Sequence, residues 1–153
     1  MTTDLAPLGR YEPQRLVIES YGVCDDAMVA IWIDRTGRRD IPGSVQVLHL
    51  ARLADFDGRT PDVESAAAAI RSIFDRIETD GARHVETWSA LQRAGDQPNG
   101  GSWRGTTLSR SEYQRITSSS SRLMLIPTDR GRAKLVAWDD DNEVWVDLIY
   151  YGD

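Results

Sequence analysis

The sequence predicts an α+β fold, in which a mostly antiparallel sheet of about six strands forms two meanders with helices between them. Three observations lead to this prediction. Short runs of β-branched and aromatic residues occur near both ends of the chain, turn-forming residues separate them, and a helical period dominates the middle. With 153 residues, we expect one globular domain over 1–153, with 1–13 as an irregular N-terminal segment.

Six runs have the composition of strands. The N-terminal meander is predicted at 14–21, 27–33 and 44–50, and the C-terminal meander at 122–126, 132–138 and 143–150. The turns at 34–38 and 129–132 both contain Asp and Gly. Because these residues suit turns in any protein, we regard an internal duplication as the weaker interpretation.

The middle of the chain predicts one long amphipathic helix at about 61–79. Its apolar residues recur at three- and four-residue spacing: Val63, Ala67, Ile70, Phe74 and Ile77. Thr60 is placed to cap the N-terminus, Pro61 suits the first helical position, and Gly81 lies just beyond the end.

Two further segments lie between this helix and the second meander. Residues 83–94 fit a helix that ends at Gly95 or a strand, and the alternation at its start favours a strand there. Residues 95–107 contain four glycines and one proline, which predicts a loop. Ser109 and Glu112 then have the spacing of a capping box for a short helix.

The acidic residues are concentrated at the C-terminal end. Residues 139–153 contain six acidic residues and no Arg or Lys, and six is also the magnitude of the net charge of −6. This charge disfavours nucleic acid as a partner, because phosphate neutralisation by basic residues supplies most of that affinity. Arg35, Arg38 and Arg39 form a local basic turn, which we interpret as an exposed charged turn.

No motif predicts a catalytic residue, a cofactor or a metal. Cys24 is the only cysteine, and the neighbouring acidic residues disfavour a reactive thiolate. His84 and Glu86 resemble half of a zinc-deaminase signature, but the cysteine half is missing. The acidic run 139–143 lacks the glycine and the final carboxylate of a calcium loop. We therefore expect a non-catalytic protein.

The C-terminal strand predicts a partner-binding surface. Strand alternation places Val146 and Leu148 on one face, and Trp145, Asp147, Ile149 and Tyr151 on the other. Large aromatic side chains can anchor a partner, and nearby acidic groups can steer a basic one. A helix packed on this face would instead make Trp145 a core residue. The predicted partner-binding residues are Asp139, Asp140, Asp141, Glu143, Trp145, Asp147 and Tyr151.

The function predicted from these features is that of a bacterial or phage immunity protein or inhibitor. It would occlude a basic toxin or enzyme through the acidic and aromatic surface. The preference for Arg, with Lys134 as the only lysine, indicates a GC-rich bacterial or phage genome. No apolar run approaches the length of a membrane span, so we expect a cytoplasmic protein with no membrane partner.

Two alternatives remain open. The first is a small-molecule-binding domain or enzyme whose site lies under the glycine-rich loop 95–107, where Trp103 could cover a ligand and Arg104 could pair with an anionic group. The second is a structural subunit of a larger assembly.

Overall fold

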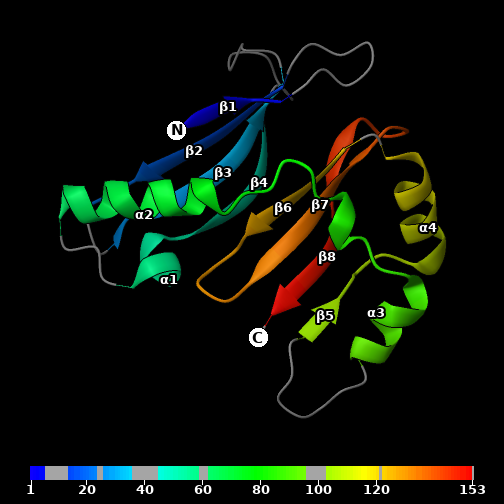
Figure 1. Ribbon diagram of the computed structural model, residues 1–153. Helices are drawn as coiled ribbons and strands as arrows, with labels where there is room; N and C mark the ends of the chain where they lie inside the picture. The colour runs from blue at the N-terminus through cyan, green and yellow to red at the C-terminus, as the bar shows by residue number, and fades with distance from the viewer. Residues whose placement is uncertain are drawn as a thin grey trace. The chain divides into compact units, whose positions relative to one another are not determined.

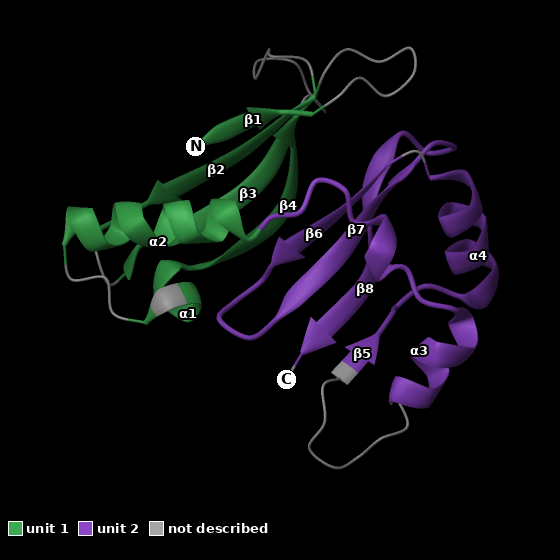
Figure 2. Cartoon of the chain, viewed as in Figure 1, with its two compact units in different colours: residues 1–76 green, residues 77–153 purple. Residues whose placement is uncertain are grey.

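The computed structural model shows an α+β protein with two antiparallel sheets of four strands each (Figure 1). It describes residues 1–5, 14–23, 26–35, 45–58, 62–95, 103–120 and 122–152. The chain divides into two compact units, Met1–Arg76 and Ile77–Asp153 (Figure 2). The expectation of a single domain stays a prediction, and each unit is described by itself.

Unit 1 contains a sheet in the order β1-β2-β3-β4 and two helices. All neighbouring strands are antiparallel. Helix α2 lies across one face of this sheet (Figure 1). The elements of unit 1 are β1 Thr2–Asp4, β2 Arg15–Tyr21, β3 Met28–Asp34, β4 Val45–Arg52, α1 Leu53–Asp57 and α2 Val63–Asp75.

Unit 2 contains a second antiparallel sheet, in the order β5-β8-β7-β6. Helices α3 and α4 pack on one face of it, where Leu91, Tyr113 and Ile116 join Leu135 and Ile149 in a buried cluster. The elements are the 3-10 helix η2 Ala82–His84, α3 Trp88–Gly95, β5 Trp103–Gly105, α4 Arg110–Ser119, β6 Leu123–Pro127, β7 Ala133–Asp139 and β8 Val144–Gly152.

The six predicted strands are present, but they divide between two sheets instead of forming one, and each sheet contains one further strand. Strands β1 and β5 are additional, and each has only three residues, too few for a periodic signal. Each is fixed by long-range pairing instead: Thr2 pairs with Val17, and Arg104 with Tyr151. The prediction that these segments are irregular was wrong at those residues.

The long helix is shorter than predicted. Its N-cap is Asp62, whose side chain accepts a hydrogen bond from the Ser65 N–H at 2.7 Å, while Thr60 and Pro61 lie outside the described residues. It ends at Asp75, because Glu78 exchanges two backbone hydrogen bonds with Leu125 of β6, at 3.1 and 2.9 Å. The apolar period continues to Ile77, but this tertiary pairing ends the helix earlier.

The segment 83–94 was only partly predicted. The start favoured a strand, whereas the structure has η2 followed by α3. Two tyrosine hydroxyls donate to backbone carbonyls of this segment: Tyr151 to His84 at the end of η2, at 2.6 Å, and Tyr113 to Glu86 between η2 and α3, at 2.8 Å. These bonds satisfy backbone groups that a strand would have paired. The capping box at Ser109 and Glu112 is confirmed at the start of α4.

A β-bulge changes the predicted faces of the C-terminal strand. Leu135 pairs with Ile149 and Val136 with Asp147, which leaves Leu148 as an extra residue in β8. Consecutive residues Leu148 and Ile149 therefore both enter the core cluster, which Val146 and Tyr151 also contact. The prediction that Ile149 and Tyr151 share a face with Trp145 was wrong for this reason.

Candidate functional site

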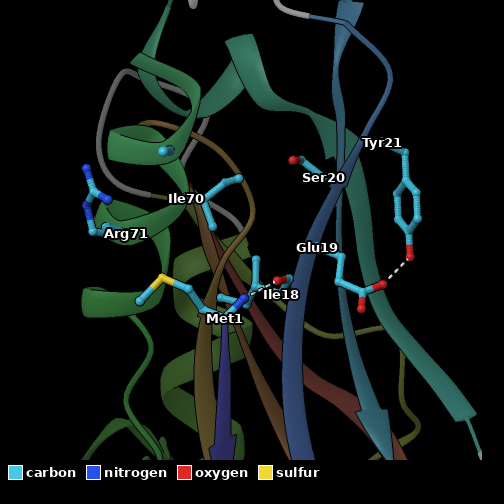
Figure 3. Close-up of a pocket in the computed structure, with 8 residues that line it drawn as sticks. Met1, Ile18, Glu19, Ser20, Tyr21, Ile70 and Arg71 are labelled. Atoms are coloured by element: carbon cyan, nitrogen blue, oxygen red, sulfur yellow. Dashed lines mark hydrogen bonds between the residues drawn. The ribbon is translucent and has the colours of Figure 1, made fainter. Parts of the chain in front are cut away.

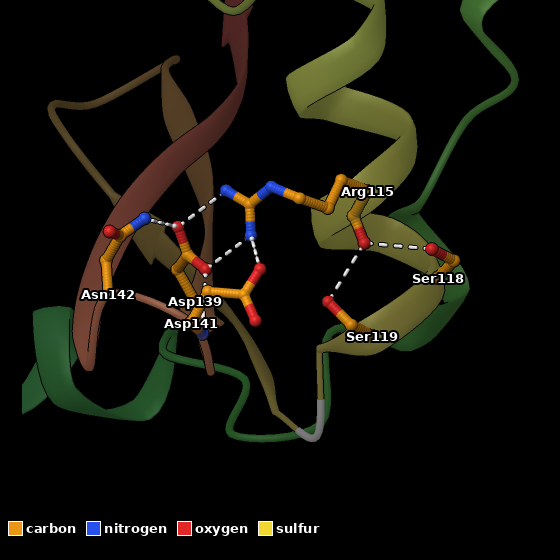
Figure 4. Close-up of polar contacts among 6 residues, drawn as sticks. All are labelled: Arg115, Ser118, Ser119, Asp139, Asp141 and Asn142. Atoms are coloured by element: carbon orange, nitrogen blue, oxygen red, sulfur yellow. Dashed lines mark hydrogen bonds and ion pairs between the residues drawn. The ribbon is translucent and has the colours of Figure 1, made fainter.

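The acidic turn at residues 139–143 joins β7 to β8 and is held by an arginine from α4. Arg115 forms a two-pronged pair with Asp139, Nη1 to Oδ1 at 2.7 Å and Nη2 to Oδ2 at 2.8 Å (Figure 4). The Asn142 side chain donates to the same carboxylate at 2.7 Å, and the Asp141 N–H donates at 3.2 Å. Asp139 is buried and organises the turn.

The electrostatics of this pair follow from its hydrogen bonds. Hydrogen bonds from Arg115 hold the pKa of Asp139 well below its usual range, against the opposing effect of burial. The same bonds raise the pKa of Arg115 above its ordinary value. Both groups therefore stay charged at neutral pH, and Asp139 is committed to the fold.

The other acids of the turn are more accessible. Asp140 and Asp141 are exposed and Glu143 is partly exposed. The Asp141 side chain is 65% exposed, although Arg115 Nη1 also donates to it at 2.7 Å. Arg115 thus pairs with two of the four carboxylates of the turn, Asp139 and Asp141. Whether these acids contact a partner stays a prediction.

Trp145 does not present an aromatic anchor on the surface. Only 3% of its surface is exposed. Its ring meets that of Trp138 edge-on, with centroids 5.8 Å apart and an angle of 66° between the planes. The structure thus buries Trp145, but not under a helix as the sequence had left open, because the cluster that contains Leu91, Tyr113 and Ile116 of α3 and α4 does not include it.

Asp147 belongs to an internal polar cluster. Lys134 Nζ lies 2.7 Å from one carboxylate oxygen, and the Tyr150 hydroxyl donates to the other at 2.6 Å. Burial and the neighbouring carboxylate raise the pKa of Tyr150 to about 12. The charge of Asp147 is therefore balanced by Lys134, and Asp147 adds little to the negative electrostatic potential at the protein surface.

Tyr151 is also engaged internally. Besides its hydrogen bond to the His84 carbonyl, its ring contacts the His84 ring with centroids 6.4 Å apart. Burial is the main cause that raises the pKa of its hydroxyl. Of the seven predicted partner-binding residues, only Asp140, Asp141 and Glu143 combine accessibility with a place on the turn.

The loop alternative has a cavity beside it. A space of about 310 Å³ is lined by Trp88, Leu91, Gln92, Arg104, Gly105, Thr106, Thr107 and Tyr150. Arg104 reaches it from β5 and pairs through Nη1 with Glu86 at 2.7 Å. Residues 96–102 and the Trp103 side chain lie outside the description, so the predicted cover over this cavity stays a prediction.

A second cavity lies in unit 1 and was not predicted. It occupies about 420 Å³ between α2 and the end of β2 (Figure 3). Met1 closes one side, where its amino group donates to the Ile18 carbonyl at 2.7 Å. Ala67, Ile70 and Arg71 of α2 contribute to the lining. No motif marks these residues, because they meet only through the packing of α2 on the sheet.

Unit 1 also exposes apolar residues on its last strand. Val45, Val47 and Leu50 of β4 are 38%, 59% and 58% exposed. Strand β4 closes one side of its sheet. The sequence predicted this strand, but it did not predict that these side chains would be exposed.

The histidine that resembled a deaminase signature lies in an ion-pair cluster. His84 Nε2 is 2.8 Å from the Glu78 carboxylate, which also accepts from Arg83 Nη2 at 2.6 Å. These hydrogen bonds lower the pKa of Glu78. Within the described ranges, no three His, Cys, Asp or Glu side chains gather to hold a metal ion.

Comparison with protein families, with characterised proteins and with solved structures found no significant match to this chain. None of the helices in the described part of the chain combines the length and the apolar character needed to cross a bilayer.

Proposed function

We propose that this chain is a non-catalytic binding protein of the immunity or inhibitor type, which uses its acidic turn to occlude a basic protein. The observation that carries the proposal is the placement of Asp140 and Asp141. Both are exposed on a turn that the Arg115–Asp139 pair fixes in position. A preorganised group of charges loses less entropy on binding than a mobile one.

The structure supports a narrower surface than the sequence predicted. Trp145, Asp147 and Tyr151 are engaged within the fold, so Asp140, Asp141 and Glu143 supply the steering charge. Charges of this kind mainly raise the association rate, and salt weakens their effect. The partner is therefore expected to present a basic surface and to bind faster at low ionic strength.

Capture from cells that encode this chain tests the proposal. The wild type is compared with Asp140→Asn/Asp141→Asn and with the matched control Glu64→Gln/Asp75→Asn, which removes two exposed acids of α2. With the captured partner purified, we expect the turn variant to lower its association rate about tenfold at low salt and the control to leave it unchanged. An acidic partner, or equal rates for both variants, would contradict the proposal.

A ligand-binding function is the second candidate, and the cavity beside Arg104 favours it. The cavity joins apolar walls from Trp88 and Leu91 to a cationic group, the combination typical of small-molecule sites. Arg104 keeps further N–H groups besides the Nη1 donor that binds Glu86. An aromatic or aliphatic molecule with one anionic group fits this chemistry.

Thermal unfolding with a panel of metabolites tests the second candidate. A ligand should raise the unfolding temperature of the wild type, since binding to the native state stabilises it by mass action. Arg104→Gln should remove the shift, whereas Arg93→Gln should retain it, because Arg93 lies on α3 and donates to the Ser89 carbonyl outside the cavity lining. A uniform absence of shifts, or a shift that survives in Arg104→Gln, would count against this function.

A further inference from the structure

A third cavity lies in unit 2, where the segment before η2 runs beside β6. Glu78 pairs with Leu125, and the Gly81 N–H donates to the Leu123 carbonyl at 2.9 Å. The cavity beside these contacts has a volume of about 320 Å³ and is lined by Thr79, Asp80, Ala82, Ser120, Arg122 and Leu123. It is separate from the acidic turn and from the cavity at Arg104.

Arg122 is the distinctive group in this cavity. Most cations of unit 2 have a carboxylate partner: Arg83, Arg104, Arg115, Arg132 and Lys134. The guanidinium of Arg122 has no hydrogen-bond or ionic partner among the described residues, although it is partly buried. Burial alone lowers the pKa of Arg122 from its ordinary value, and the group still carries its charge at neutral pH. A partly dehydrated guanidinium is a preformed site for a carboxylate or phosphate group.

Asp80 places the opposite charge in the same lining. Its carboxylate accepts one long hydrogen bond, from the Ala82 N–H at 3.4 Å, and makes no ion pair with Arg122 within 4.0 Å. The two charges therefore face one cavity without neutralising each other. An inorganic dianion would be attracted by Arg122 and repelled by Asp80. A molecule that carries both charges satisfies the two groups together.

Neutral groups complete the lining. Ser120 is committed to its own turn, because its hydroxyl donates to the Arg122 carbonyl at 2.8 Å. Thr79 is exposed and offers a hydroxyl. The pairing of β6 with β7 directs the N–H of Leu123 away from β7, toward the segment that contains Asp80. Ala82 and Leu123 add apolar contact.

We propose that this cavity binds a free α-amino acid, with its carboxylate on Arg122 and its ammonium group on Asp80. The α-amino acid class carries both charges on one small molecule, as the two groups of the lining require. The cavity volume lies at the lower end of the usual range for ligand sites, roughly 300–1,000 Å³, which suits a molecule of this size.

Titration of the whole protein with each of the twenty amino acids, followed by amide chemical shifts in NMR, tests the proposal. Acetate, methylamine and inorganic phosphate serve as probes with one type of charge. We expect saturable shifts at Ala82 and Leu123 for at least one amino acid, with a Kd about tenfold lower than that of acetate. Absence of saturation for all twenty up to tens of millimolar, or phosphate binding at least as tightly, would overturn the proposal.

Variants assign the two charges. Arg122→Gln should raise the Kd of the amino acid at least about tenfold, and Arg122→Lys should raise it less, since Lys keeps the charge but not the planar fork. Asp80→Asn should raise the Kd of the amino acid. It should also lower the Kd of acetate relative to that of the amino acid. The control Arg110→Gln removes an exposed arginine that does not line the cavity, and should leave the Kd within about twofold. Amide spectra verify that each variant is folded, and an unchanged Kd in folded Arg122→Gln would refute the assignment.

Discussion

The last strands of the two units, β4 and β8, have similar pairing but opposite surroundings. Each pairs with the strand before it through a bulge that leaves one extra leucine, Leu48 in β4 and Leu148 in β8. Strand β8 lies between β5 and β7, whereas β4 closes its sheet. Both bulge leucines are buried, but Ile149 next to Leu148 is buried as well, while Val47 and Leu50 on either side of Leu48 are exposed. Position in the sheet, more than strand composition, therefore decides which apolar residues become core.

Position in the sheet also decides which charged residues of β8 and its turn are exposed. The buried Asp139 pairs with Arg115, and the buried Lys134 pairs with the half-buried Asp147, because a buried charge without a partner would be costly. Only the acids beyond the end of β7 remain exposed. A binding surface on this hairpin is therefore limited to the turn. Of four predictions, the first and the last compare unit 2 with unit 1, and the other two test packing and charge within unit 2.

The largest expected effect concerns a buried leucine of β8, Leu148, and an exposed leucine of β4, Leu50. Leu148→Ala should lower the free energy of unfolding by about 2–5 kcal/mol, because it removes buried methyl groups and leaves a cavity. Leu50→Ala makes the same chemical change at an exposed site and should stay within about 0.5 kcal/mol. Urea denaturation of both variants measures the contrast. Similar losses at the two sites would show that Leu50 is covered in solution.

The second prediction concerns the buried end of the acidic turn. Asp139→Asn should lower the free energy of unfolding by about 2–3 kcal/mol, because it removes one member of a charged pair and weakens the turn. The folded pKa of Asp139 lies below its unfolded value, so this stabilisation is present at neutral pH and declines as the pH falls below about 4.

Denaturation at pH 7, 4 and 3 therefore provides the test. The difference between the wild type and Asp139→Asn should narrow toward low pH. Asp140→Asn is the control, because Asp140 is exposed next to the same pair, and it should cost less than about 0.5 kcal/mol. A difference that does not change with pH would contradict the charged state assigned to Asp139.

The third prediction concerns close packing at the start of unit 2. A Cβ atom on Gly81 would lie 2.7 Å from Leu135 Cδ1 and 3.3 Å from the Leu123 backbone. Gly81→Ala should therefore destabilise the protein by about 1–2 kcal/mol. In a double-mutant cycle, Leu135→Val should recover part of this loss, because it shortens the side chain that the new methyl group meets. Additive losses would place the strain at the backbone instead.

Elements defined by neighbouring residues were predictable from the sequence, whereas elements defined by distant contacts were not. Alternation and helical periods located six strands, α2 and the capped start of α4, since these signals depend on neighbours along the chain. The short strands β1 and β5, the bulge at Leu148 and the early end of α2 depend on contacts distant in sequence. The same limit applies to the site. Acidity at 139–143 was evident, but its neutralisation by Arg115 requires α4 to pack beside the turn.

The smallest expected effect compares two tyrosine–carboxylate pairs, one in each unit. The Tyr150 hydroxyl donates to Asp147 at 2.6 Å in a half-buried position, and Tyr21 donates to Glu19 at 2.5 Å on the exposed end of β2. Tyr150→Phe should lower the free energy of unfolding by about 1 kcal/mol at neutral pH. Tyr21→Phe should lower it by less than about 0.5 kcal/mol, since water readily replaces an exposed hydrogen bond.

The pH dependence distinguishes this hydrogen bond from simple packing. The folded pKa of Tyr150, about 12, lies above the ordinary tyrosine value, so its stabilisation is complete below about pH 10 and is lost as the pH rises toward 12. The difference in unfolding free energy between the wild type and Tyr150→Phe should therefore shrink above pH 10. A constant difference would mean that the hydroxyl contributes through packing, and Asp147 would then rely on Lys134 alone.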